Sequence, residues 1–176
     1  MHKVLINSSK VLIAAVNGPA VGFGTSSIAL FDLVYSVPDA SFFTPFAKLG
    51  LCPEACSSIS FTRIMGRQKA ASLLLAGDRV TPQELESAGL ISKILPKEGF
   101  MDAVMNIAQR IAAQPPQALV ATKKLMMASI REELLAANEM ECDELKRRVE
   151  SSEPRAAMEA FAREQEAKRK GRKASQ

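Results

Sequence analysis

One carboxylate stands apart from the other acids in the first eighty residues of the chain. Glu54 lies in a run of small and apolar residues from 48 to 60, and no cation or second acid occurs within five residues of it. Burial without a partner raises the pKa of a carboxyl group, because the charged form loses its hydration. A raised pKa suits a general base that works near neutral pH. Glu54 is therefore a candidate catalytic base.

The local sequence also allows a simpler role for Glu54. A helix is predicted to begin near Ser57, and polar residues just before a helix commonly cap its free backbone N–H groups. Glu54 would then be a solvated turn residue with a structural task. The neighbouring residues do not decide between a helix cap and a base.

A second candidate site is the turn that follows the first predicted strand. Gly22 and Gly24 flank Phe23, and residues 25–27 can cap a helix that begins within residues 28–31. Two glycines let a ligand carbonyl approach the Phe23 N–H at a helix start, where a developing oxyanion is stabilised. Close packing of the helix on the strand is the alternative. The turn lacks the Gly-Lys-Ser/Thr of a phosphate loop and the third glycine of a dinucleotide fingerprint.

Composition excludes several classes of site and protein. The 176 residues fit one aliphatic-rich domain with a formal charge of +4, and five cations fall within residues 168–173. Cys52, Cys56 and Cys142 with a single histidine, His2, cannot form a structural zinc site, so we expect reduced cysteines and no metal. No signal peptide or membrane span is evident, and the final Ala-Ser-Gln differs from a Ser-Lys-Leu peroxisomal signal. These features predict a soluble intracellular protein.

The candidate residues must be positioned by a mixed first half and a helical second half. A continuous apolar run at 11–16 predicts a strand buried on both faces, and therefore parallel pairing. Turn residues and apolar spacing predict the remaining elements. We expect strands at 33–37 and 40–44, joined by a tight turn, and a further strand at 90–95. Helices are expected at 57–65, at 67–75 with Gly77 as the end, and directly after a Thr81–Glu84 capping box. The second half should contain helices at 100–111, 119–129, 130–149 and 155–170.

Four segments, in this order and at this spacing, resemble the crotonase (enoyl-CoA hydratase/isomerase) superfamily, and most closely the peroxisomal-type Δ3,Δ2-enoyl-CoA isomerases. They are LIAAVNGPAVG (12–22), TPFAKLG (44–50), PEACSS (53–58) and AGLISKILP (88–96). The resemblance implies an α/β fold in which a partial spiral of ββα units precedes a C-terminal helical region. We therefore assign residues 1–98 to the C-terminal part of that core, 99–170 to a helical oligomerisation region and 171–176 to a basic disordered tail.

The resemblance also implies a reaction and its residues. Members of this family bind an acyl-CoA thioester whose carbonyl accepts from two backbone N–H groups, and Phe23 matches the second donor. Glu54 matches the isomerase glutamate, which shuttles a proton as the double bond of a 3-enoyl-CoA moves to the 2-position in unsaturated fatty acid β-oxidation. The two hydratase glutamates correspond to Ser26 and Phe46, so both are missing. The remaining positions implied to bind substrate are Gly22, Gly24, Leu51, Pro53 and Ala55, and coenzyme A enters as part of the substrate with no separate cofactor.

The chain begins late relative to this family. About a third of the family fold, with the first oxyanion donor and much of the CoA loop, normally precedes the strand predicted at 11–16. The alternative function is therefore a catalytically silent subunit or interaction module. We expect a homo-oligomer (trimer or hexamer) or a hetero-assembly with a full-length homologue, in the peroxisome or mitochondrion. The basic tail lacks interleaved aromatic residues, so no nucleic-acid partner is expected.

Overall fold

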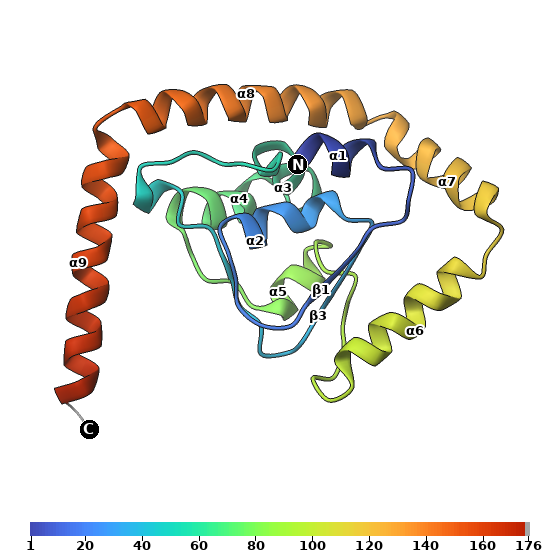
Figure 1. Ribbon diagram of the computed structural model, residues 1–176, viewed down its shortest axis with the longest axis horizontal. Helices are drawn as coiled ribbons and strands as arrows, with labels where there is room; N and C mark the ends of the chain where they lie inside the picture. Colours follow the sequence, from blue (N-terminus) through green and yellow to red (C-terminus); the bar gives the residue numbers. More distant parts are fainter. Residues whose placement is uncertain (175–176) are drawn as a thin grey trace.

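The computed structural model describes the backbone of residues 1–174 and the side chains of residues 1–164. A core of short strands and helices is surrounded by four longer helices, which run along the right, the top and the left of the view in Figure 1. These helices are α6 (Phe100–Ala112), α7 (Pro116–Ala128), α8 (Arg131–Glu150) and α9 (Glu153–Ala174). All four predicted helices of the second half are confirmed, with small shifts at their ends.

Two small parallel sheets lie in the core. One has the order β1-β3-β5, formed by β1 (Ile13–Val16), β3 (Leu33–Ser36) and β5 (Lys93–Ile94), and the other pairs β2 (Ala20–Val21) with β4 (Phe42–Phe43). Ile13 lies opposite Leu33, and Ala20 lies opposite Phe42. Parallel pairing was expected and is confirmed. The runs at 33–37 and 40–44 do form strands, but the turn between them passes the chain from one sheet to the other.

The prediction that the first strand is buried on both faces is wrong. All four residues of β1 are half-buried, because β1 lies at an edge of the three-stranded sheet with β3 as its neighbour. The apolar sequence of β1 is typical of a central strand, but β1 lies at the edge of the sheet. Of the strand predicted at 90–95, Lys93 and Ile94 form β5, and the Ser92 and Leu95 N–H groups also donate to carbonyls of β3, at 2.8 and 2.9 Å.

Short helices connect these strands and cover the sheets. They are α1 (His2–Asn7), α2 (Phe23–Ser26), the 3₁₀ turns η1 (Ser27–Leu30) and η2 (Ala47–Leu49), α3 (Ser57–Met65), α4 (Arg67–Ala71), the π-turn η3 (Ser72–Ala76) and α5 (Pro82–Ser87). The capping box of Thr81 and Glu84 is present as predicted. The expected cap at residues 25–27 is not: Thr25 Oγ1 instead donates to the Ala20 carbonyl at 2.7 Å and accepts from the Phe43 N–H at 3.2 Å.

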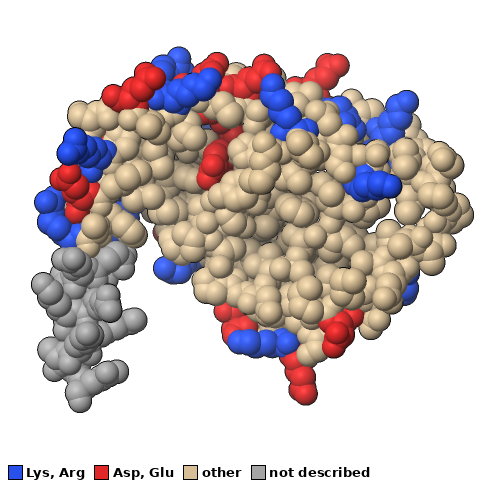
Figure 2. Space-filling view, viewed as in Figure 1, with Lys and Arg blue, Asp and Glu red and all other residues tan. Residues whose placement is uncertain are grey.

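The main core is aliphatic and aromatic, and it lies within the first half of the chain plus α6. Phe42 and Phe61 are fully buried in it, and Phe100 and Val104 of α6 join it. A smaller cluster forms where α1, η1 and α3 meet α8. Figure 2 shows charged side chains along α8 and the upper part of α9 and at the lower edge of the molecule, with a broad uncharged face between them.

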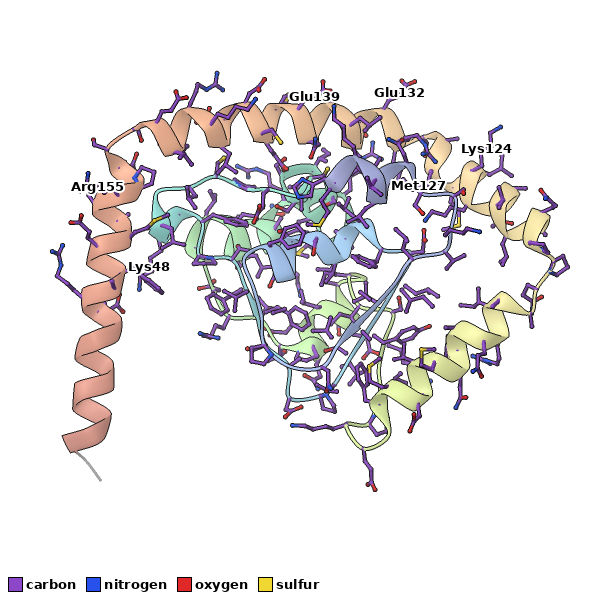
Figure 3. The ribbon with its side chains drawn as sticks, in the orientation of Figure 1. Lys48, Lys124, Met127, Glu132, Glu139 and Arg155 are labelled. Carbon is purple, nitrogen blue, oxygen red and sulfur yellow. The ribbon has the colours of Figure 1, made fainter. Side chains whose placement is uncertain are left out.

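The last helix rests against η2 through a close backbone contact. Gly50, at φ +69°, lies so near the start of α9 that a Cβ there would sit 3.0 Å from the Pro154 backbone. Lys48 points toward α9 (Figure 3), where its ammonium lies 5.1 Å from the centre of the Phe161 ring and pairs with Glu164 at 2.5 Å. The tail assigned to 171–176 begins inside α9, and its side chains lie outside the described residues.

Within residues 1–174, none of the helices combines the length and the apolar character that a membrane crossing requires. The passage from mixed to all-helical structure falls between β5 and α6, close to residue 99. The oligomerisation role of the helical half stays a prediction.

Candidate active site

Glu54 lies on an irregular loop between η2 and α3, and the backbone directly after it is strained. Ala55 and Cys56 have φ values of 57° and 61°, and they are the only non-glycine residues with positive φ in the described chain. The left-handed conformation costs a non-glycine residue about 1–2 kcal/mol. Such strain persists only where the surroundings determine the conformation, and it is frequent at functional sites. Something must therefore hold this turn in place.

The N–H groups at the start of α3 have acceptors other than the Glu54 carboxylate. The Ser57 N–H and hydroxyl donate to the Glu54 carbonyl at 3.1 and 2.7 Å. The N–H groups of Cys56 and Ser58 donate to the carboxylate of Glu141, at 2.7 and 2.9 Å. The Glu54 carboxylate takes none of these donors. The hypothesis that its side chain caps the helix is therefore wrong.

The Glu54 carboxylate is instead half-buried, and two titratable side chains, His2 and Glu141, act on it. Burial raises its pKa above the ordinary value for glutamate, and the negative charge of Glu141 raises it further, while the positive charge of His2 opposes both. A carboxylate with this bias holds a proton more readily than a solvated one. It can thus take up a proton from a carbon acid and release it within one site.

The glycine turn meets the Glu54 loop through Phe23. The Phe23 ring stacks on His2 with a centroid distance of 5.6 Å, and it packs against the small cluster that contains Ala55 and Cys56. His2 Nδ1 donates to Asn138 Oδ1 at 2.9 Å, which fixes the imidazole from the α8 side. Residues of α1, α2, the α3 loop and α8 therefore converge on one place.

Phe23 is the first residue of α2, a position whose N–H cannot bond within its own helix. Gly22, just before it, has φ 54° and ψ −116°, a conformation that favours glycine. A Cβ at Gly22 or Gly24 would make only ordinary contacts of 3.8–4.0 Å. Close packing of helix on strand therefore does not require these glycines, whereas the backbone turn that presents the Phe23 N–H requires Gly22.

The remaining predicted positions are distributed around the loop. Leu51 and Pro53 are half-buried, and Leu51 packs against the main core. Ala55 is fully buried in the small cluster, so its side chain lies beneath the loop. Ser26 and Phe46, which stand at the hydratase positions, are both buried and bring no carboxylate. Roles in substrate binding stay predictions.

All three cysteines are free, and burial raises the pKa of the Cys56 thiol to about 12, which keeps it protonated and unreactive. Among the described residues no group of histidine, cysteine and acidic side chains could hold a metal ion.

Three residues of this site were missed from the sequence: His2, Asn138 and Glu141. Asn138 and Glu141 are three residues apart on a strongly charged helix, and nothing in the local sequence distinguishes them from their exposed neighbours. Their burial, at 5% and 7% exposure, follows from how α8 docks. The sequence offered no signal for that docking.

The Enoyl-CoA hydratase/isomerase family profile matches residues 1–172. The chain belongs to this family. Its members of known structure confirm the fold: an enoyl-CoA hydratase/isomerase from Pseudoalteromonas atlantica superimposes with a TM-score of 0.90 at 29% identity, covering 93% of this chain and 66% of that one. The α/β crotonase-like assignment is thereby confirmed.

Among family members, the chain is 41% identical over 148 residues to enoyl-CoA delta isomerase 2 of Rattus norvegicus, covering 84% of this chain and 38% of the relative. It is 35% identical over 156 residues to the peroxisomal enoyl-CoA delta isomerase 3 of Mus musculus, covering 89% of this chain and 49% of the relative. The chain thus spans less than half the length of these two relatives.

Proposed function

We propose that this chain is an enoyl-CoA isomerase of the Δ3,Δ2 type, with Glu54 as its proton shuttle. The observation that carries the proposal is the state of the Glu54 carboxylate. It is half-buried, its pKa is raised, and it is not used to cap α3, whose first N–H groups have other acceptors. A group placed in this way, at a strained turn, is available for proton transfer.

The reaction requires one base on one face of the substrate. The Glu54 carboxylate would take a proton from C2 of a 3-enoyl thioester, and the electron pair would move toward the thioester oxygen as an enolate. The protonated carboxyl would then return the proton at C4, which leaves the double bond between C2 and C3. The Phe23 N–H is the proposed donor to the enolate oxygen, and removal of a single oxyanion donor typically costs about 3–4 kcal/mol in the barrier.

The residues at two other positions favour isomerisation over hydration. Adding water across the double bond requires groups that activate and orient that water. Ser26 and Phe46 stand where the hydratase glutamates are expected, and both are buried side chains without charge. A single half-buried carboxylate fits a proton shuttle better than it fits water activation.

The proposed substrate is an acyl-CoA thioester, in which coenzyme A is part of the substrate and no other cofactor is needed. We propose assembly as a homo-oligomer, a trimer or hexamer, or together with a longer relative. A peroxisomal or mitochondrial location is proposed because one relative is named as peroxisomal. Lipid β-oxidation is the corresponding process.

Turnover of a 3-enoyl-CoA to the conjugated 2-enoyl-CoA, followed by the absorbance of the conjugated thioester, tests the reaction. Wild type should convert the substrate, and Glu54→Gln should lose at least a hundredfold in kcat, a loss within the range attributed to a positioned base (about 10²–10⁴). Glu98→Gln, an exposed substitution with the same loss of charge, is the matched control and should retain activity.

Two results would contradict the proposal. Equal turnover by wild type and Glu54→Gln would remove Glu54 from the reaction. A folded wild type with no turnover would favour the silent-module alternative, and size-exclusion chromatography with a full-length homologue would then show whether the chain joins its assembly.

A further inference from the structure

Helix α8 carries one carboxylate into the interior of the protein. Its charged side chains are otherwise mostly solvent-facing, and Figure 3 shows the labelled Glu132 and Glu139 on its outer side. Glu141 is only 7% exposed. Burying a charge is costly unless hydrogen bonds compensate it. The position of Glu141 therefore depends on the donors that it meets.

Those donors all belong to the segment that follows Glu54. The two Glu141 carboxylate oxygens accept the Cys56 N–H at 2.7 Å, the Ser58 N–H at 2.9 Å and the Ser58 hydroxyl at 2.6 Å. The two N–H groups lie at the beginning of α3, where a negative charge is also favoured by the helix dipole. Without Glu141 they would be buried donors with no acceptor in their own helix.

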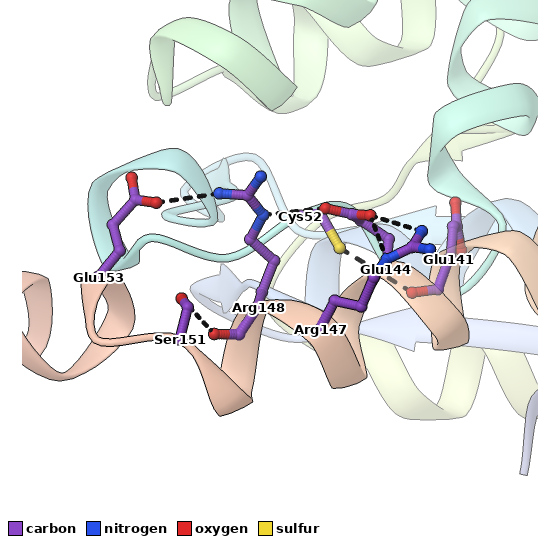
Figure 4. A network of polar contacts seen from close by, with 7 residues as sticks. All are labelled: Cys52, Glu141, Glu144, Arg147, Arg148, Ser151 and Glu153. Carbon is purple, nitrogen blue, oxygen red and sulfur yellow. Dashed lines mark hydrogen bonds and ion pairs between the residues drawn. The ribbon is translucent and has the colours of Figure 1, made fainter.

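Further contacts tie the Glu54 loop to α8 on both sides of Glu54. Cys52 Sγ lies 3.9 Å from the Glu141 carbonyl oxygen, and Figure 4 shows this contact between the loop residue Cys52 and Glu141 of α8. Cys56 Sγ lies 3.2 Å from the Leu134 carbonyl oxygen. The loop residues that bracket Glu54 are thus both held against one helix, and Glu141 supplies the strongest of these contacts because its hydrogen bonds are charge-assisted.

We propose that Glu141 is a positioning residue for Glu54. By accepting the Cys56 and Ser58 N–H groups, it holds the left-handed turn at Ala55 and Cys56 and so fixes the direction in which the Glu54 side chain leaves the loop. This inference rests on the proposed role of Glu54. Proximity and orientation of a base contribute strongly to rate, so a loop that drifts without unfolding should lose turnover.

A purely structural cap would stabilise α3 without influencing the chemistry. The two roles differ in a measurable way, since the Glu141 charge also acts on the Glu54 carboxylate. The charged groups that act on Glu54 are His2, from α1, and Glu141, from α8. Removing the Glu141 charge should lower the pKa of Glu54, because one of the two influences that raise it is lost.

The test compares wild type with Glu141→Gln, Glu141→Ala and Ser58→Ala in the 3-enoyl-CoA assay. We expect Glu141→Gln to lower kcat at least tenfold with KM changed less than threefold, and to move the acid limb of the kcat/KM profile to lower pH. Ser58→Ala, which removes one donor and leaves both N–H contacts, should lose less than threefold. Glu132→Gln is the control, with the same change of charge at an exposed position of α8.

Hydrogen exchange separates failure of this inference from failure of the proposed function. The Cys56 and Ser58 amides should exchange at least tenfold faster in Glu141→Ala than in wild type, whether or not the chain turns over substrate. Faster exchange with an inactive wild type supports the positioning contact and contradicts the isomerase assignment. Unchanged kcat, acid limb and amide exchange in Glu141→Gln and Glu141→Ala would overturn the inference, and Glu141→Gln keeps the test valid if Glu141→Ala does not fold.

Discussion

Residues 1–98 bury large apolar side chains such as Phe42 and Phe61 in the main core, whereas α7 and α8 lie outside that core and bury several polar side chains. Lys123, Asn138 and Glu141 are each 5–7% exposed, and each bonds to a residue in the first half of the chain. The only buried apolar residues of these two helices are Leu134 and Ala137. Apolar packing thus forms the main core, whereas α7 and α8 dock beside it through a small apolar cluster and through directional hydrogen bonds.

This difference matters because the two kinds of contact specify geometry to different degrees. Apolar burial is non-directional, and it tolerates small shifts of a helix along its axis. A buried charge that must meet particular N–H groups tolerates far less, since any shift leaves polar groups unpaired. The polar contacts of α8 lie beside His2 and beside the Glu54 loop, where a small displacement would change the candidate site.

The largest effect is expected where the core depends on packing alone. Phe61→Ala removes a fully buried ring and should lower the free energy of unfolding by about 3–5 kcal/mol. Urea denaturation followed by circular dichroism measures this loss. Leu125→Ala, at a position 76% exposed, is the matched control and should stay within about 0.5 kcal/mol of wild type. A loss below 1 kcal/mol for Phe61→Ala would contradict the description of the core.

A somewhat smaller effect is expected at the polar anchor of α7. The Lys123 ammonium donates to the Asp32 carboxylate and to the Lys10 carbonyl, both at 2.6 Å. Lys123→Met leaves the half-buried Asp32 carboxylate without its cation, with the Leu12 N–H still donating to it, and should cost about 3 kcal/mol in the free energy of unfolding. Lys3→Met, which breaks the exposed pair with Glu139, should cause no measurable change. Equal effects of the two substitutions would show that burial does not distinguish these anchors.

A still smaller effect is expected where α9 meets η2. Gly50→Ala places a Cβ 3.0 Å from the Pro154 backbone and also strains a left-handed residue. Gly99→Ala has the same left-handed strain at φ +65°, with nothing within 4 Å of the added Cβ, so it measures the strain without the clash. Gly50→Ala should lower the free energy of unfolding by about 1 kcal/mol more than Gly99→Ala, the lower end of the cost of overpacking. Equal losses in the free energy of unfolding would mean that α9 moves away from position 50 without a measurable cost.

Much of the fold was accessible from the sequence because its signals are local. The capping box at Thr81, the glycine at the end of η3 and the apolar spacing of α6 each act within a few residues, and each was predicted. The apolar run of β1 does not by itself reveal its edge position, since such a run is compatible with a central or an edge strand. Neighbour order in a sheet depends on contacts between segments far apart in the chain.

The same distinction between local signals and distant contacts separates the site residues that were predicted from those that were not. Glu54 was identified because it stands alone among apolar residues, and the Gly22 turn was identified by its glycines. Glu141 was not, because its burial depends on contact with a segment about 85 positions away in the sequence. From the sequence, Glu54 was a candidate cap for α3. A carboxylate does cap that helix, but it is the carboxylate of Glu141 on α8. Because Glu141 accepts the Cys56 and Ser58 N–H groups, the Glu54 carboxylate has no capping role, as the proposed proton transfer requires.

The most direct test of the account is a titration of the Glu54 side-chain carboxyl by carbon-13 NMR, in wild type and in Glu141→Gln. We expect a wild-type pKa above the value of about 4.3 for an unperturbed glutamate, because burial and the Glu141 charge both favour the protonated form. We also expect a lower pKa in Glu141→Gln. A wild-type pKa at or below the ordinary value, unchanged by Glu141→Gln, would contradict the claim that this loop prepares Glu54 to act as a base.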